Sequence, residues 1–298
     1  MAVSDTEFSK MLKKKLRKYD AVIVPVKASR LEIMTTKKVP IEKLHPNPED
    51  EFCDPKIGPH FGIIGDYTSK FMRFGTMTPS IDDEPLMVQK IHPDGYMILN
   101  GHHRWAAALR CGFKKVPVKI VNLAQETDIE KMIAASEHDK RVTLDLDETI
   151  FCRDEFEPAE KPLKFPYNKM YKEHICLGLP MLMHYLAKEG YDVWVYSANC
   201  YSIDYIRSYF SHYSVKIDGI ITGTGKKTGS AEARKRTEGM IADKYVETVH
   251  IDRNMILCTK RGEKDFQEYE LDPDSPTWAR DTARILRKIF SDGKNGDK

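Results

Sequence analysis

The chain has 298 residues with 47 basic and 45 acidic side chains, and this near balance of charge argues against a general nucleic-acid-binding surface. Its length predicts about two domains, each large enough for its own core. The first ten residues lack the apolar core of a signal peptide, no apolar run reaches the roughly 20 residues of a membrane helix, and the six cysteines lack C-x-x-C spacing. We therefore expect a reduced, cytoplasmic protein rather than a membrane protein, a disulfide scaffold or a zinc ribbon.

We expect residues 1–36 to form an N-terminal extension of one helix and two strands. A basic helix is expected over residues 4–18, because Phe8, Leu12 and Leu16 recur at helical spacing. Its run of lysines is interpreted as a solvated face, with contact to RNA, DNA or anionic lipid as the alternative. Strands are expected over 21–26 and 31–36.

Residues 37–124 predict a small α+β domain. A strand-like start is followed by the acidic turn PNPEDE, and later the runs 86–91 and 96–99 flank the turn HPDG as a hairpin. Asn100 and Gly101 then precede a helix that Gly112 ends, and the strand 116–121 closes the unit.

The start of that helix predicts an anion site. Gly101 is followed by His102, His103 and Arg104, where free backbone N–H groups and the positive helix end attract negative charge and the guanidinium adds a planar donor. The structural alternative is a plain helix start capped by Asn100, with both histidines as polar surface.

The segment LNGHHRWAAALRCGFKKVPVKIV, with the PNP turn before it, is similar to the ParB and sulfiredoxin superfamily over about residues 39–123. That family contains CTPases, ATP-using sulfinic acid reductases and free serine kinases. The resemblance implies that the nucleotide phosphates bind to Gly101, His102, His103 and Arg104. Glu49 is the implied base of this domain, with Glu51 as the alternative.

Two residues of this segment depart from the family. His102 stands where sulfiredoxins have their catalytic cysteine, and Asn100 stands where kinase-type members have an aspartate. Complete ParB proteins continue into a helix-turn-helix region, whereas residues 125–140 leave room for one linker helix. We therefore do not expect this chain to bind DNA.

Residues 141–291 predict a second α/β domain. Three β-rich runs end on polar residues: VTLDLDET places Asp145 and Asp147 at a strand end, VWVY leads to Ser197, and VHI leads to Asp252. Such groups meet where parallel strands end. Paired carboxylates suit Mg²⁺, and one can attack phosphorus while the other transfers the proton. The structural alternative to a metal and phosphate site is a helix N-cap or turn that is rich in acidic residues.

With Lys226 and Lys227 after a TGTG turn, this order resembles the haloacid dehalogenase (HAD) superfamily of phosphohydrolases. The resemblance implies that Asp145 is the nucleophile, Asp147 the general acid and base, and Ser197 a phosphate hydrogen-bond donor. It also implies that Lys227, or alternatively Lys226, balances the phosphate charge. The implied Mg²⁺ ligands are Asp145, the backbone carbonyl of Asp147, and Asp252.

One position departs from the HAD pattern, because Arg253 stands where many relatives have a second acid, with Asn254 as a substitute oxygen donor. Between the stretch that carries Asp145 and Asp147 and the stretch that carries Ser197, we expect a charged flap over residues 151–174 and a helix over 175–188. A small flap admits bulky substrates, although the N-terminal domain is an alternative lid. After an edge strand at 266–271, an amphipathic helix is expected over 277–290 and a disordered tail over 292–298.

These observations predict an α/β protein: a Rossmannoid, HAD-like parallel sheet and a separate, smaller α+β domain of the ParB and sulfiredoxin type. The expected function is Mg²⁺-dependent hydrolysis of a phosphorylated small molecule or phosphoprotein through an aspartyl-phosphate, with nucleotide bound by the N-terminal domain. The alternative is a nucleotide-dependent kinase or NTPase with a regulatory HAD half. A third reading is a nucleotide-binding module that recruits the phosphatase to a partner.

Overall fold

The computed structural model describes residues 5–16, 24–80, 83–225, 231–263 and 266–296. The chain divides into two compact units. The N-terminal unit comprises 1–123 with the short segments 200–204 and 225–229, and the C-terminal unit contains the rest. Among the described helices, none combines the length and the hydropathy that a bilayer-spanning segment requires.

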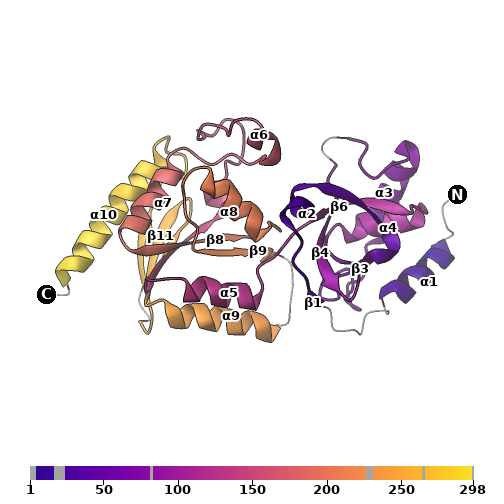
Figure 1. Cartoon of the computed structure of the whole chain (residues 1–298), viewed down its shortest axis with the longest axis horizontal. Helices are drawn as coiled ribbons and strands as arrows, with labels where there is room; N and C mark the ends of the chain where they lie inside the picture. Colours follow the sequence, from indigo (N-terminus) through magenta and orange to yellow (C-terminus); the bar gives the residue numbers. More distant parts are fainter. Residues whose placement is uncertain (1–4, 17–23, 81–82, 226–230, 264–265, 297–298) are drawn as a thin grey trace. The chain divides into compact units, whose positions relative to one another are not determined.

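The N-terminal unit is built on a mixed sheet in the order β2-β6-β4-β5-β3, with β1 paired to β4 (Figure 1). Its strands are β1 (Val24–Pro25), β2 (Thr36–Pro40), β3 (Leu44–Pro46), β4 (Leu86–His92), β5 (Tyr96–Asn100) and β6 (Lys115–Ile120). β4 and β5 form the expected antiparallel hairpin, while β4 with β6 and β3 with β5 run parallel. The helices are α1 (Asp5–Leu16), α2 (Arg30–Met34), the 3-10 turn η1 (Ile41–Lys43), α3 (Phe61–Phe74) and α4 (His102–Arg110).

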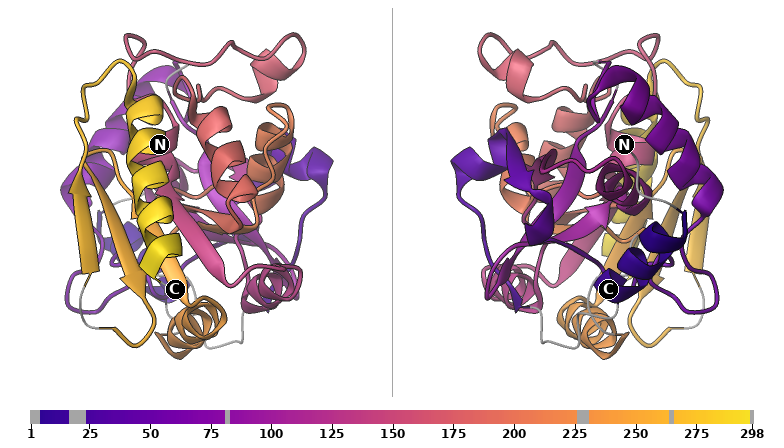
Figure 2. Two further views of the ribbon diagram at one scale, coloured as in Figure 1. Left: turned by 90° about the vertical axis from the view of Figure 1, so that its left-hand side faces the viewer. Right: turned by 90° about the vertical axis from the view of Figure 1, so that its right-hand side faces the viewer.

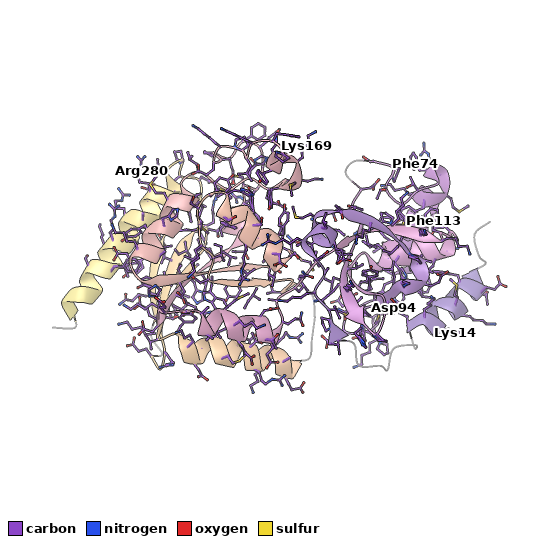
Figure 3. The ribbon with its side chains drawn as sticks, in the orientation of Figure 1. Lys14, Phe74, Asp94, Phe113, Lys169 and Arg280 are labelled. Atoms are coloured by element: carbon purple, nitrogen blue, oxygen red, sulfur yellow. The ribbon has the colours of Figure 1, made fainter. Side chains whose placement is uncertain are left out.

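The helix α1 confirms the expected amphipathic start. Phe8 and Leu12 are buried in the core of the N-terminal unit, whereas Lys13 and Lys14 are exposed, and Figure 3 shows Lys14 pointing outward. The expected helix residues 17 and 18 lie outside the described residues, as do residues 21–23 of the expected strand over 21–26, of which Val24–Pro25 form β1.

The expected strand over 31–36 is wrong for its first four residues, which belong to α2. Ser29 and Glu32 form a reciprocal capping box: the Ser29 N–H donates to Glu32 Oε2 at 2.9 Å, and the Glu32 N–H donates to Ser29 Oγ at 3.4 Å. These two bonds satisfy the first-turn donors and favour a helix over a strand. The strand begins only at Thr36.

The C-terminal unit has the sheet order β12-β11-β10-β7-β8-β9. Its strands are β7 (Lys140–Asp145), β8 (Tyr191–Ser197), β9 (Gly219–Thr222), β10 (Glu247–Ile251), β11 (Met255–Lys260) and β12 (Phe266–Glu270). β7 is central and runs parallel to β8 and β10, and β9 runs parallel to β8. β11 and β12 extend the sheet as antiparallel strands.

Helices cover both faces of this second sheet. The described helices of this unit are α5 (Glu126–Ala134), α7 (Leu179–Lys188), α8 (Ile203–Ser211), α9 (Ala231–Lys244) and α10 (Trp278–Gly296), with the short α6 (Tyr167–Met170) in the flap. α5 and α9 lie together on one face, and α7 and α10 lie on the other (Figures 1 and 2). α5, expected as a linker, therefore packs as part of the C-terminal unit.

The expected α/β class, with a separate smaller domain, agrees with these two mixed sheets. Two helix bounds differ from expectation. α7 begins at Leu179 rather than at 175, because Gly178 precedes it in the left-handed region with φ 84°. α10 continues to Gly296, across most of the expected disordered tail.

Candidate functional sites

A cavity of about 390 Å³ lies at the start of α4 in the N-terminal unit. Its lining comes from α3, from the segment before β4 and from the turn between β5 and α4: Ile63, Tyr67, Asp83, Glu84, Asn100, Gly101, His102, His103 and Arg104. The four residues expected to bind phosphate therefore lie together on one wall. α3 was not expected from the sequence, and it supplies an aromatic and an aliphatic side chain to the same cavity.

The turn into α4 requires glycine. Gly101 has φ +99°, and a Cβ placed on it would lie 2.7 Å from Leu86 Cδ2 and 3.1 Å from both Nε and Nη2 of Arg104. The guanidinium thus folds back over the turn. No described side chain caps α4, so the backbone N–H groups of its first turn and the guanidinium provide the donors that an anion needs.

The two histidines each use one ring nitrogen to hold a neighbouring loop. His102 is 4% exposed, and its Nε2 accepts the Asn47 N–H at 3.1 Å while its Nδ1 lies 3.6 Å from Asp50 Oδ1. His103 Nε2 accepts the N–H of His60 at 3.1 Å. Burial lowers the pKa of His103 below 6.5, which agrees with an unprotonated accepting nitrogen. Both rings therefore position the walls of the cavity.

Arg104 is held at the cavity rim. Its Nη1 donates to the Glu84 carbonyl oxygen. The neighbouring Asp83 is paired with Lys70, and the hydrogen bond from that lysine lowers the pKa of the carboxyl. The positive charge of Arg104 also lowers this pKa, so the guanidinium lies near the Asp83 carboxylate as well as beside the helix start.

Glu49 lies in the turn that follows β3. Its N–H donates to Asn47 Oδ1 at 3.1 Å, and the Asn47 N–H in turn donates to His102. The glutamate is part of the loop fastened to the cavity wall but is not one of the cavity-lining residues. Its expected role as a base stays a prediction.

The ends of three parallel strands form a second candidate site in the C-terminal unit. Asp145 is the last residue of β7, Ser197 is the last of β8, and Asp252 directly follows β10. Leu144 pairs with Ile251, which places Asp252 level with Asp145 on the neighbouring strand, at a strand spacing of about 4.8 Å. Asp145 pairs with Tyr196, so Ser197 lies one residue farther along on the other side.

The carboxylates of this second site are fixed by hydrogen bonds. Asp145 Oδ1 accepts the N–H groups of Asp147 at 2.7 Å and Glu148 at 2.8 Å, within the π-helical turn η2 (Leu146–Ile150). Ser197 Oγ donates to Asp147 Oδ2 at 2.5 Å. Burial, together with the neighbouring acids, raises the pKa of Asp145. A cation among these hard oxygen donors would offset that repulsion, so the donor set fits Mg²⁺.

Lys226 and Lys227, the expected charge-balancing residues, lie outside the described residues. The segment leading to them passes beside Ser197, because the N–H and Oγ1 of Thr224 donate to the Ser197 carbonyl oxygen at 3.1 and 3.0 Å.

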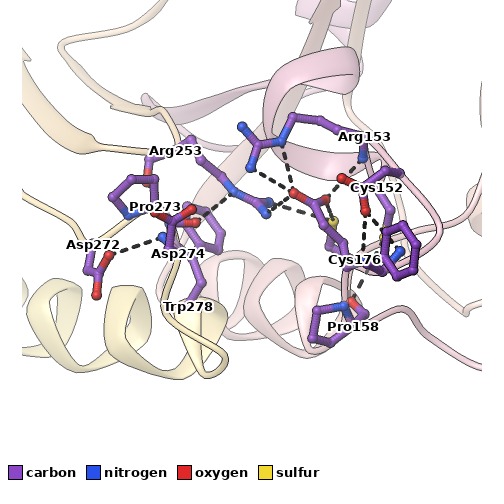
Figure 4. A network of polar contacts seen from close by, with 12 residues as sticks. Cys152, Arg153, Pro158, Cys176, Arg253, Asp272, Pro273, Asp274 and Trp278 are labelled. Atoms are coloured by element: carbon purple, nitrogen blue, oxygen red, sulfur yellow. Dashed lines mark hydrogen bonds and ion pairs between the residues drawn. The ribbon is translucent and has the colours of Figure 1, made fainter.

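Arg253 explains the departure from the expected acidic pattern. Its Nη2 donates to Glu157 Oε1 at 2.8 Å, and its Nε donates to the Pro273 carbonyl oxygen at 3.3 Å (Figure 4). The guanidinium also lies 5.7 Å from the ring of Trp278. The side chain therefore fastens the flap to the segment before α10.

Comparison with known proteins bears on the N-terminal unit. Residues 76–136 match the family model of the ParB N-terminal domain. The match includes a ParB-like segment of the N-terminal unit, residues 76–123, and continues through α5 of the C-terminal unit. An ATP-dependent L-serine kinase from Staphylothermus marinus is 35% identical over 72 residues, which make up 24% of this chain and 28% of that protein. The chain thus spans about a quarter of the length of this curated relative.

Solved structures of the chromosome-partitioning protein ParB from Caulobacter crescentus also match the chain. One, complexed with CTP-gamma-S, is 24% identical with a TM-score of 0.24 and covers 35% of this chain and 56% of that one. Another, complexed to the centromeric parS site, is 26% identical with a TM-score of 0.22 and covers 34% and 50%. The expected absence of DNA binding finds no support in these comparisons. The family match ends at residue 136, so the HAD resemblance stays a prediction.

Proposed function

We propose that the ParB-like domain is a nucleotide-dependent kinase that phosphorylates the hydroxyl of a free amino acid, with serine as the first acceptor to test. The sequence match to an ATP-dependent L-serine kinase carries this proposal. The cavity at the start of α4 supports it, since that cavity gathers the first turn of α4 and a guanidinium on one wall. The ParB-like domain is thus favoured as the main activity over the phosphatase expected from the sequence.

The chemistry needs an anion site and an acceptor of one proton. In this proposal the nucleotide phosphates bind the first turn of α4 and Arg104, where negative charge is stabilised as the phosphoryl group transfers. The acceptor oxygen forms a bond to the terminal phosphorus as the bond to the nucleoside diphosphate breaks. Glu49 is the proposed acceptor of the hydroxyl proton, because its turn is fastened to the cavity wall through His102. Mg²⁺ bound with the nucleotide would offset phosphate charge.

The test incubates the full chain with free serine and ATP, CTP, GTP or UTP in turn, and follows phosphoserine by mass spectrometry. Arg104→Ala should abolish the product. Arg73→Ala is the matched control, because Arg73 lies in the last turn of α3 in the same unit, over the exposed Phe74 ring, and is not one of the cavity-lining residues. Asp145→Asn should leave the product unchanged. Equal product from Arg104→Ala, or no phosphoserine with any nucleotide, would overturn the proposal.

A second candidate function, Mg²⁺-dependent phosphohydrolysis, is favoured by the arrangement of Asp145, Asp147 and Ser197. Asp145 would attack phosphorus while Asp147 protonates the leaving oxygen, and Asp147 would then take a proton from the water that opens the aspartyl-phosphate. Mg²⁺ would be held by Asp145, Asp252 and the Asp147 carbonyl oxygen and would supply positive charge beside the phosphate.

Turnover of p-nitrophenyl phosphate, measured with Mg²⁺ and with chelator, tests this second function. Asp145→Asn should remove the activity and leave serine phosphorylation intact. Activity of Asp145→Asn near the wild-type rate would refute the assignment of the nucleophile.

A further inference from the structure

Three potential metal ligands meet at the base of the flap in the C-terminal unit, apart from the two candidate sites. The ligand atoms of Cys152, Glu157 and Cys176 all lie within 4.8 Å of one another. Cys152 lies at the start of the flap, Glu157 lies in its turn, and Cys176 lies two residues past its end; Figure 4 shows the two cysteines with the arginines around them. The wide sequence spacing hides this cluster from any search for C-x-x-C pairs.

The backbone sets the distance between the two thiols. Phe151 and Ile175 form an antiparallel bridge, and the Cys152 N–H donates to the His174 carbonyl oxygen at 2.8 Å. Cys176 lies two residues beyond His174, so the two cysteines are diagonal neighbours. Diagonal residues have Cα atoms about 7–8 Å apart, whereas disulfide-bonded cysteines usually have Cα atoms about 4.4–6.8 Å apart. A tetrahedral ion with metal–sulfur bonds of about 2.3 Å holds two sulfurs about 3.8 Å apart, and the ligand atoms here all lie within 4.8 Å of one another. The pairing therefore suits a shared ion better than a disulfide.

Glu157 presents one oxygen to the thiols and the other to two arginines. Oε1 accepts from Arg253 Nη2 and Arg153 Nε, both at 2.8 Å. Oε2 accepts the Arg153 N–H at 3.0 Å and lies 3.6 Å from Cys176 Sγ. Oε1 is thus held from outside, in the way that hydrogen-bonding partners orient a ligating carboxylate. Two thiolates and a carboxylate around a divalent ion carry one excess negative charge, which the arginines offset.

We propose that Cys152, Cys176 and Glu157 bind one divalent cation of the zinc class. Each thiol loses its proton to solvent as its sulfur bonds the metal, and no electrons are transferred. Cys152 is only partly buried, which leaves a water molecule access to the fourth position of a tetrahedral ion. The bound ion ties together the two strands and the turn of the flap.

The test uses the full chain, reduced and stripped of metal, titrated with Co²⁺. We expect thiolate-to-cobalt charge-transfer absorption that saturates at one ion per chain and disappears when Zn²⁺ is added. Cys152→Ser and Cys176→Ser should each remove this band, while circular dichroism reports whether each variant is folded. Cys258→Ser is the matched control, since Cys258 is a free, partly buried thiol of β11 outside the cluster, and it should retain the band.

A second readout does not depend on the cysteine variants. Zn²⁺ should protect Cys152 and Cys176 of the wild-type chain from alkylation but leave Cys258 reactive, as mapped by mass spectrometry. Arg153→Met should weaken cobalt binding about 10- to 100-fold, because it removes side-chain support for the carboxylate. A band that persists in the Cys152→Ser, Cys176→Ser double variant, or equal alkylation with and without Zn²⁺, would overturn the proposal.

Discussion

Arg104 lies so close over Gly101 that a Cβ on the glycine would approach its Nε and Nη2 to 3.1 Å, while the opposite contact, Leu86 Cδ2, would be only 2.7 Å away. Gly101→Ala should therefore displace the guanidinium and abolish nucleotide binding. It also places a side chain at φ +99°, a left-handed conformation that costs about 1–2 kcal/mol. Isothermal titration with each nucleotide and urea unfolding measure the two effects.

Gly112→Ala is the matched control for this substitution. Gly112 follows the other end of α4 with φ +74°, and a Cβ there would meet nothing within 4 Å. This variant should lose only the conformational part of the stability and keep nucleotide binding. If Gly101→Ala and Gly112→Ala bound nucleotide equally well, close packing against Arg104 and Leu86 would not be the reason for a glycine at position 101.

The positions that the sequence predicted best are those at element ends, while the roles assigned to these residues stay predictions. Asp145, Ser197 and Asp252 follow short β-rich runs, and parallel strands bring their carboxyl ends together whatever the loops between them do. The same logic placed Gly101 and Arg104 at a helix start. Such positions depend on the local pattern of apolar residues and on one rule, that the carboxyl ends of parallel strands meet at one edge of the sheet. The pattern of apolar residues is therefore enough to find them.

Residues whose role depends on distant partners could not be found in this way. In the sequence, Arg253 only occupies a position where an acidic residue was expected. Its ion pair with Glu157 of the flap depends on the folded chain. Tyr67 lines the cavity only because α3, begun by the accepting ring of His60, packs beside α4. Cys152 and Cys176 meet through one backbone bridge that has no spacing signature. The capping box of Ser29 and Glu32, by contrast, has a sequence signature, a serine followed three residues later by a glutamate, which indicates a helix rather than a strand at α2.

Protonation of His103 should weaken the N-terminal unit at mildly acidic pH. Burial lowers the pKa of His103 below its ordinary 6.5, so the unfolded chain binds the proton more readily than the folded one. The stability that this histidine contributes is complete above pH 6.5 and is lost as the pH falls through the folded pKa. His103→Gln should flatten the rise of unfolding free energy with pH in that window, as measured by urea denaturation. His138→Gln, at an exposed histidine, is the control and should leave the pH dependence unchanged. If His103→Gln also left the slope of unfolding free energy against pH unchanged, the proposed coupling of His103 protonation to stability would be wrong.

The hydroxyl of Ser197 should matter to phosphohydrolysis through Asp147. Ser197→Ala removes the 2.5 Å hydrogen bond to Asp147 Oδ2 and leaves the proton-transferring carboxyl free to turn. Loss of one such positioned donor costs about 100-fold in kcat. The measurement is turnover of p-nitrophenyl phosphate with saturating Mg²⁺. Ser208→Ala, which removes a hydrogen bond to Tyr171 elsewhere in the same unit, should retain the rate; a comparable loss there would show that packing, not positioning, is responsible.

Arg253→Met should loosen the flap without disturbing the sheet. The substitution removes hydrogen bonds to Glu157 and to the Pro273 carbonyl oxygen, and charged hydrogen bonds of this kind contribute about 2 kcal/mol. Hydrogen exchange should accelerate at the amides of Cys152 and Cys176, which bridge the two flap strands, while the amides of β7 stay protected. Arg280→Met is the control, because Arg280 is exposed on α10 (Figure 3). Unchanged exchange at both cysteine amides in Arg253→Met would mean that the backbone bridge alone holds the flap.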